Sequence, residues 1–122
     1  MAFDVQFNEA GGYITARVSG EWTEDNLKSG IDALAAEARR LGCSRALLDI
    51  RDLSRPKSGY DRFVVGEYIA QVWGPPLKLR VAAVAVPDMI NKLTEDTAVN
   101  RGADFLVTDD MYEAIRWLSD GG

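Results

Sequence analysis

The chain has 122 residues, of which 47% are hydrophobic and 27% charged, and its formal net charge is −5. This size and composition are typical of one compact domain, so we expect a single domain over residues 1–122. The chain has no histidine and one cysteine, Cys43, which excludes Ser-His-Asp and Cys-His catalysis, histidine-bound zinc or haem, and intramolecular disulfides. Its acidity argues against a nucleic-acid partner, because neutralising phosphates requires a basic face.

The N-terminal ten residues lack the basic start and apolar core of a signal peptide. No apolar run approaches the ~20 residues that span a membrane. We therefore expect a cytoplasmic protein without a membrane span, and no part of the pattern indicates a bound cofactor.

Alternating apolar and polar residues predict an N-terminal β-hairpin, with strands near residues 3–7 and 13–18. A helix is expected next, because Thr23 is a suitable N-cap and Trp22 can pack on Leu27 one turn into the helix. Its apolar stripe recurs every three or four residues, and Gly42 can supply the left-handed residue that ends it.

The rest of the chain alternates buried strands with helices. The strand predicted over 46–50 is followed by a polar loop over 51–57 and then by a helix that ends near Trp73, before Gly74 and two prolines. Further along, we expect a strand over 79–86, a helix from Pro87 to near Asn100, a strand over 103–107 and a last helix capped by the Thr108-Asp109-Asp110 segment.

This pattern predicts an α/β fold with the order β-β-α-β-α-β-α-β-α and a mixed, mostly parallel five-stranded sheet. The three later strands are each reached through a helix, so they should be parallel by right-handed crossovers. The first strand should form an antiparallel edge.

Three segments resemble the SpoIIAA-like family, which includes anti-anti-sigma factors, STAS domains and a STAS/SEC14-type bacterial group of unknown function. They are Gly20-Glu21-Trp22-Thr23, Leu47-Leu48-Asp49-Ile50-Arg51-Asp52-Leu53 and Glu113-Ala114-Ile115-Arg116-Trp117-Leu118. The resemblance covers nearly the whole chain and implies a single SpoIIAA-like domain that works as a regulatory protein-interaction module.

The resemblance also places Ser58 at the serine that a partner kinase phosphorylates in anti-anti-sigma factors. Those proteins usually show Asp-Ser-Ser-Gly-Leu-Gly there, whereas this chain has lysine, serine, glycine and tyrosine at 57–60. The implied role of Ser58 is that of a phospho-acceptor which controls partner docking.

Ser58 also has a rationale from local chemistry, because it begins an S-x-x-D pattern ahead of a predicted helix. One interpretation is an ordinary helix cap, which is the usual use of serine there. The other is an anion or phosphate site at the helix N-terminus, formed by Ser58 and Gly59 with the cations Arg55, Lys57 and Arg62.

Five aspartates lie at the predicted carboxyl ends of three parallel strands: Asp49, Asp52, Asp88, Asp109 and Asp110. Open α/β sheets bind ligands at this end, so a magnesium site is one interpretation. Helix capping is the simpler one, since no fixed ligand spacing of a calcium loop or phosphate-binding motif is present.

Aromatic residues gather in and after the predicted second helix: Tyr60, Phe63, Tyr68 and Trp73. They make this helix apolar over more than a narrow stripe, which is compatible with simple burial in the core. The alternative is an interaction or ligand surface enriched in aromatic anchors.

Together these observations favour a non-enzymatic cytoplasmic interaction module whose second helix recognises a protein partner or a second copy of the chain. The alternative is a carrier of a small anion or an acyl chain, bound between that helix and the loop before it. Catalysis without histidine would require carboxylates, serine, tyrosine, lysine or arginine, and no pair of these has diagnostic spacing.

Overall fold

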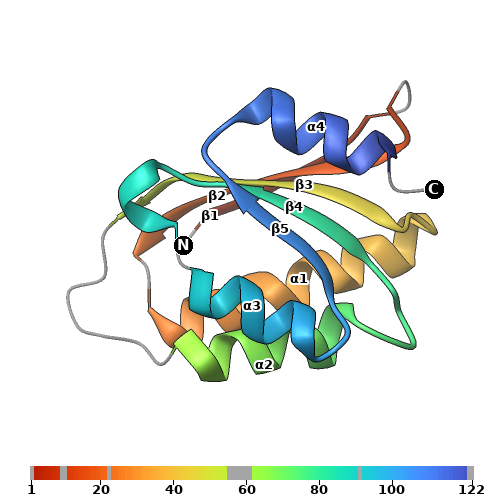
Figure 1. Cartoon of the computed structure of the whole chain (residues 1–122). Helices are drawn as coiled ribbons and strands as arrows, with labels where there is room; N and C mark the ends of the chain where they lie inside the picture. Colours follow the sequence, from red (N-terminus) through yellow and green to blue (C-terminus); the bar gives the residue numbers. More distant parts are fainter. Residues whose placement is uncertain (1, 9–10, 22, 55–61, 91, 121–122) are drawn as a thin grey trace.

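The computed structural model describes residues 2–8, 11–21, 23–54, 62–90 and 92–120 (Figure 1). Its elements in chain order are β1 (Ala2–Asn8), β2 (Tyr13–Glu21), α1 (Glu24–Leu41), β3 (Arg45–Ser54), α2 (Arg62–Trp73), β4 (Arg80–Val84), the 3₁₀ helix η1 (Pro87–Met89), α3 (Lys92–Asn100), β5 (Asp104–Thr108) and α4 (Met111–Asp120). The predicted α/β class and element order are confirmed, with η1 as an addition.

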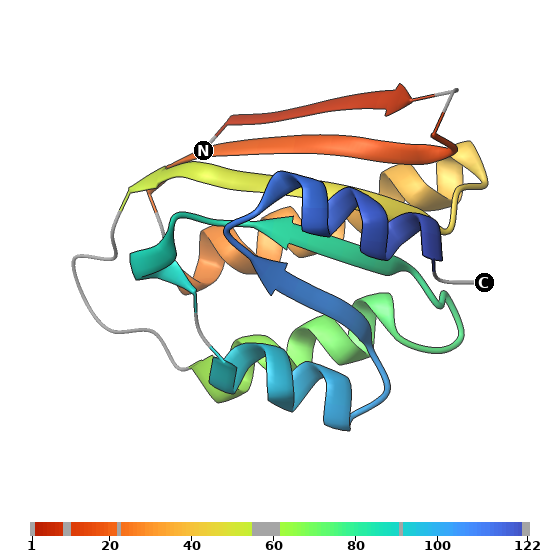
Figure 2. The same ribbon diagram turned by 45° about the horizontal axis from the view of Figure 1, so that its top comes forward.

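The five strands form one sheet in the order β1-β2-β3-β4-β5. β1 pairs antiparallel with β2, and the other three pairs of neighbours are parallel. Helices α1, α2 and α3 cover one face of this sheet, and α4 lies on the other (Figures 1 and 2). The antiparallel edge strand and the parallel crossovers are therefore as predicted.

The main hydrophobic core lies between the sheet and α1–α3. Its largest fully buried side chains are Trp73, Ile14, Leu34, Leu79 and Val81. A smaller core lies under α4, where Ala114 and Leu118 pack on Leu47, Ala82 and Val84. The sheet is thus buried on both faces only where α4 covers it, which explains the continuous apolar runs of β3 and β4.

Local capping signals act as expected at two helices. The Thr23 side chain accepts a hydrogen bond from the Asn26 backbone N–H at 3.1 Å, and Gly42 ends α1 in a left-handed conformation with φ of 62°. Asp110 caps α4, because its carboxylate accepts the backbone N–H of Tyr112 at 2.9 Å. The predicted packing of Trp22 lies outside the described residues.

The third strand is longer than predicted. Residues from Arg51 onward were expected to form a loop, but β3 continues to Ser54 alongside β2. Leu53 pairs with Gly20 and is buried, and the Ser54 hydroxyl donates to the Gly20 carbonyl at 3.0 Å. The prediction was wrong because pairing with a neighbouring strand, which local polarity does not reveal, extends the strand.

The segment after β4 also differs from its prediction. The strand expected over 79–86 forms only from Arg80 to Val84, and Pro87 begins the short η1 turn in place of a helix. α3 starts separately at Lys92. Proline at the first helical position is compatible with either kind of turn, so the sequence did not distinguish them.

Candidate functional site

The predicted anion site falls on a segment that the structure does not describe. Outside the described residues lie Arg55, Lys57, Ser58, Gly59 and Tyr60, together with the side chain of Arg62. The segment joins the end of β3 to the start of α2 (Figure 1). The capping and anion-binding interpretations of Ser58 therefore both stay predictions.

Trp73 belongs to the core, which is the first of the two interpretations given for the aromatic residues; it does not contribute to an interaction surface. The side chain is only 2% exposed, and its indole N–H donates to the Ile31 carbonyl of α1 at 3.0 Å. It also contacts the Phe105 ring, with centroids 5.7 Å apart. The indole bridges α1 and the sheet, and its polar N–H is satisfied internally, as a buried tryptophan requires.

Tyr68 is half-buried and ties α2 to α1. Its hydroxyl donates to the Asp32 carboxylate, with distances of 2.7 and 2.8 Å to the two oxygens. This hydrogen bond raises the pKa of Tyr68 above its ordinary value, and partial burial and the Asp32 charge act in the same direction. Because the hydroxyl already has a partner, Tyr68 contributes a fixed contact between helices.

Among the described aromatic residues of α2, Phe63 is the most exposed, at 43%. The Arg101 guanidinium lies 5.1 Å from its ring centroid and also contacts the Glu67 carboxylate at 3.5 Å. Leu93 and Val99 on α3 are exposed as well. We refer to Phe63, Glu67, Leu93, Val99 and Arg101 as the α2/α3 face.

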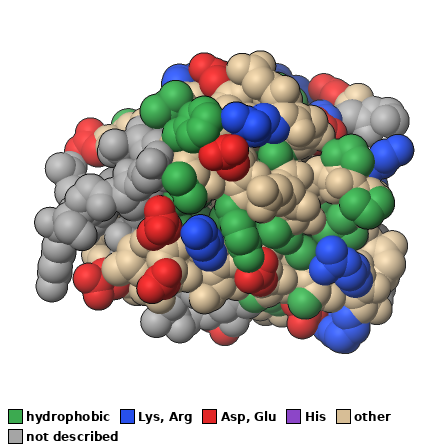
Figure 3. Space-filling model, turned by 90° about the horizontal axis from the view of Figure 1, so that it is seen from below, with side chains coloured by type: hydrophobic (Ala, Val, Ile, Leu, Met, Phe, Trp, Pro, Cys, Tyr) green, Lys and Arg blue, Asp and Glu red, His purple; other side chains and the backbone are tan. Residues whose placement is uncertain are grey.

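The two helices of this face are packed tightly together. A Cβ placed on Gly66 of α2 would come within 2.8 Å of the Thr94 carbonyl oxygen and the Thr97 Cβ of α3. Seen from the helix-covered side, the surface mixes hydrophobic, basic and acidic side chains (Figure 3). An open pocket of about 230 Å³ lies here, lined by Glu67, Ala70, Gln71 and Arg101.

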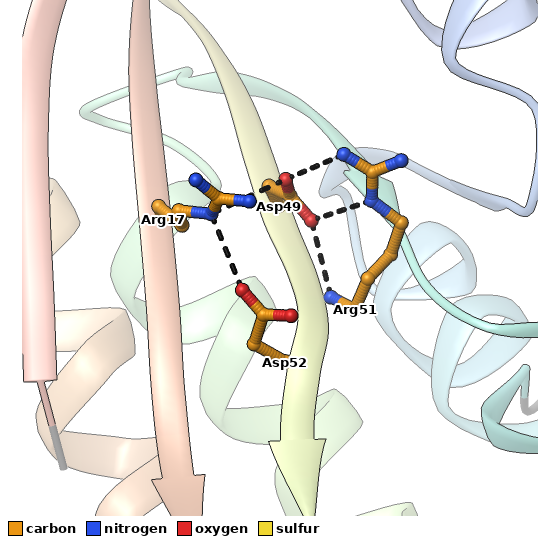
Figure 4. A network of polar contacts seen from close by, with 4 residues as sticks. All are labelled: Arg17, Asp49, Arg51 and Asp52. Atoms are coloured by element: carbon orange, nitrogen blue, oxygen red, sulfur yellow. Dashed lines mark hydrogen bonds and ion pairs between the residues drawn. The ribbon is translucent and has the colours of Figure 1, made fainter.

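A polar network that the sequence analysis did not anticipate lies at β2 and β3 (Figure 4). The Asp49 side chain, 10% exposed, accepts three hydrogen bonds from Arg51: from the backbone N–H at 3.1 Å, from Nε at 3.0 Å and from Nη2 at 2.8 Å. Arg17 of β2 lies 3.9 Å from Asp49 and 3.3 Å from Asp52. Opposite charges are thus paired within the network.

Arg51 controls the ionisation of Asp49. The hydrogen bonds from the Arg51 side chain are the largest influence and lower the pKa of Asp49, whereas burial opposes them. Only part of this network could be predicted from the sequence. Asp49 and Arg51 are two residues apart on one strand, but the approach of Arg17 depends on the register between β2 and β3.

The five aspartates are not gathered into a metal site. Asp49 and Asp52 are held by arginines, and Asp110 caps a helix. Within the described ranges, no three acidic or cysteine side chains are close enough to hold a metal ion. The capping interpretation is confirmed for Asp110.

None of the described helices combines the length and apolarity needed to cross a bilayer.

No protein-family model matches the sequence, and no curated protein is similar to it at a significant level. Solved structures are similar in fold. An anti-sigma factor antagonist from Mycobacterium paratuberculosis aligns with a TM-score of 0.62 and 17% identity, covering 98% of this chain and 94% of its own. An uncharacterised DUF3478-family protein with a SpoIIAA-like fold, from Shewanella loihica PV-4, aligns with a TM-score of 0.58 and 18% identity, covering 96% and 92%. The chain therefore has a SpoIIAA-like fold, as the resemblance implied.

Replacing Asp49 should destabilise the protein in a pH-dependent way. At neutral pH we expect Asp49→Asn to lower the free energy of unfolding by about 1–3 kcal/mol, because it removes charge-assisted hydrogen bonds from a nearly buried site. The folded-state pKa of Asp49 is lowered, so its contribution is present above the unfolded pKa of about 3.9 and is lost as pH falls through the folded value. Urea unfolding at neutral and acidic pH measures both effects.

The matched control is Asp52→Asn, which removes an exposed ion pair with Arg17. It should cost no more than about 1 kcal/mol. Equal losses for the two variants, or a loss for Asp49→Asn that does not shrink in acid, would contradict this assignment.

Proposed function

We propose that this chain is a non-enzymatic regulatory module that binds a protein partner through the α2/α3 face. The observation that carries the proposal is the half-exposed Phe63 ring with the Arg101 guanidinium beside it, together with the exposed apolar side chains Leu93 and Val99 on α3. Aromatic and arginine side chains are enriched in protein interfaces and supply much of their binding energy.

The fold supports this proposal by analogy. One structural neighbour is described as an anti-sigma factor antagonist, a name that implies action on another protein. Because one architecture hosts many functions, the analogy indicates a class of function and leaves the partner open.

The chemistry of the described residues favours binding over catalysis. The chain has no histidine, and the buried carboxylates Asp49 and Glu95 are engaged by Arg51 and Lys92. The pocket at the α2/α3 face, about 230 Å³ with two charged lining residues, is smaller than the roughly 300–1,000 Å³ of ligand sites. At the α2/α3 face, the small size of this pocket also favours a protein partner over an acyl chain.

We further propose that Ser58 controls this interaction as a phospho-acceptor. It lies five positions before Phe63, with Arg55, Lys57 and Arg62 nearby in sequence. Phosphorylation would add about −1.5 to −2 charges. If a docking partner covers this segment together with the Phe63 anchor, such charges would have to be desolvated, so the phosphorylated form should bind more weakly.

The aromatic anchor is tested by Phe63→Ala. Loss of a central aromatic side chain typically costs ~2 kcal/mol or more, so we expect partner affinity to fall about 30-fold. Quantitative affinity purification from the native host identifies the partner, and calorimetry with the purified partner measures the affinity.

Tyr112→Ala is the matched control, because Tyr112 is 84% exposed on α4, across the sheet from the α2/α3 face. It should leave the affinity within about twofold of the unmodified chain. A partner that binds Phe63→Ala as tightly as the original chain would refute the proposed face.

Control at Ser58 predicts a covalent mass increment of one phosphate on protein purified gently from its host, lost in Ser58→Ala. Intact-mass measurement followed by peptide mapping tests this. A chain that carries no phosphate under any growth condition, or carries it elsewhere, would contradict the assignment of Ser58.

A further inference from the structure

The two edge strands of the sheet, β5 and β1, differ in how their outward backbone groups are covered. At β5, the backbone N–H of Val107 donates to the Glu95 carboxylate at 2.9 Å, and Glu95 is itself buried and held by Lys92 at 2.7 Å. A side chain of α3 thus satisfies a backbone amide of this edge strand. Natural sheets commonly block an edge in this way, which prevents pairing with another chain.

β1, at the opposite edge, has no such protection in the described part of the chain. No described strand pairs with its outer side, and Figure 2 shows no helix beyond it. It pairs with β2 over seven residues without a register shift, and it contains no proline, glycine or lysine. Its outward backbone groups therefore form a long, regular template for another strand.

We propose that a second copy of this chain occupies the edge, with the two β1 strands pairing antiparallel about a two-fold axis at Val5. The pairing would join two five-stranded sheets into one continuous sheet. A second copy is a suitable occupant because two β1 strands can pair along their whole length without opposing like charges.

When two identical strands pair antiparallel, the residue numbers of every cross-strand pair add up to the same total. Paired side chains must project to the same face of the sheet, so this total is even and the two-fold axis passes through a residue. An axis at Val5 pairs all seven residues and places Asp4 opposite Gln6 of the second copy. An axis at Asp4 pairs five residues and sets the two Asp4 charges against each other. An axis at Gln6 also pairs only five. The paired length is therefore greatest with the axis at Val5, and like-charge repulsion further disfavours the axis at Asp4.

The same register also covers an exposed hydrophobic side chain. Phe7 is 45% exposed at the edge of the sheet face that α1, α2 and α3 cover, and an axis at Val5 would place it within the paired length of the two β1 strands. This surface is distinct from the α2/α3 face, so the inference does not depend on the proposed function.

Charge substitutions at Gln6 test both the surface and the register. Asp4 and Gln6 are exposed, so changes at Gln6 should leave the fold intact, which circular dichroism can verify. With an axis at Val5, Gln6→Lys creates two symmetry-related contacts with Asp4 and should tighten the dimer about fivefold, whereas Gln6→Glu creates two like-charge contacts and should weaken it about fivefold. Sedimentation equilibrium at low ionic strength, from micromolar to millimolar protein, measures the dissociation constants.

Gln71→Lys and Gln71→Glu are the matched controls, because Gln71 is exposed on α2 and the changes alter net charge identically. They should move the dissociation constant by less than twofold. Opposite responses to the two Gln6 variants support the proposal. The proposal is overturned if the chain stays monomeric at millimolar concentration, or if both Gln6 variants weaken the dimer. It is also overturned if no variant changes the dissociation constant, or if only the Gln71 variants change it.

Discussion

The arrangement of helices around the sheet depends on one constraint: each new parallel strand is added on the same side of the preceding one. β2, β3, β4 and β5 lie side by side in chain order, and crossovers between parallel strands are right-handed in nearly all proteins. Three successive crossovers in the same direction must therefore pass over the same face of the sheet. This explains why α1, α2 and α3 form one layer, while only α4, which follows the last strand, lies on the opposite face (Figure 1).

The surfaces of the molecule follow from that constraint. A ten-residue helix covers only part of the sheet, and α4 contacts β3, β4 and β5. Its C-terminal carbonyls are held by two arginines: Arg45 donates to Leu118 at 3.2 Å and Arg80 to Trp117 at 2.6 Å. On this face, part of β2 and β3 has no covering helix. The side chains there are not packed as a hydrophobic core but form paired charges: Arg17, Asp49, Arg51 and Asp52 (Figure 4). The layer of three helices leaves the α2/α3 face exposed, and α3 closes the β5 edge while β1 stays open.

Much of this fold could be predicted from sequence because its signals are local. The Thr23 cap, the left-handed Gly42 and the strand–helix alternation each depend on neighbouring residues. The errors arose where a distant segment decides the outcome. β3 extends to Ser54 because β2 pairs with it, and the sequence did not reveal that pairing. Of the α2/α3 face, the sequence predicted only Phe63. Arg101, whose guanidinium lies over the Phe63 ring, follows the end of α3, 38 positions further along the chain. No local sequence pattern connects these two residues.

The contrast between the open and closed edges is most directly tested by amide hydrogen exchange measured by NMR on dilute protein. Exchange rates report which backbone groups are hydrogen-bonded in the folded state. We expect the Val107 amide to exchange slowly, because Glu95 accepts its hydrogen bond. Alternate amides of β1, those facing away from β2, should exchange rapidly and become protected as the protein concentration rises. Rapid exchange at Val107, or slow exchange along the whole of β1 in dilute protein, would contradict a sheet with one closed and one open edge.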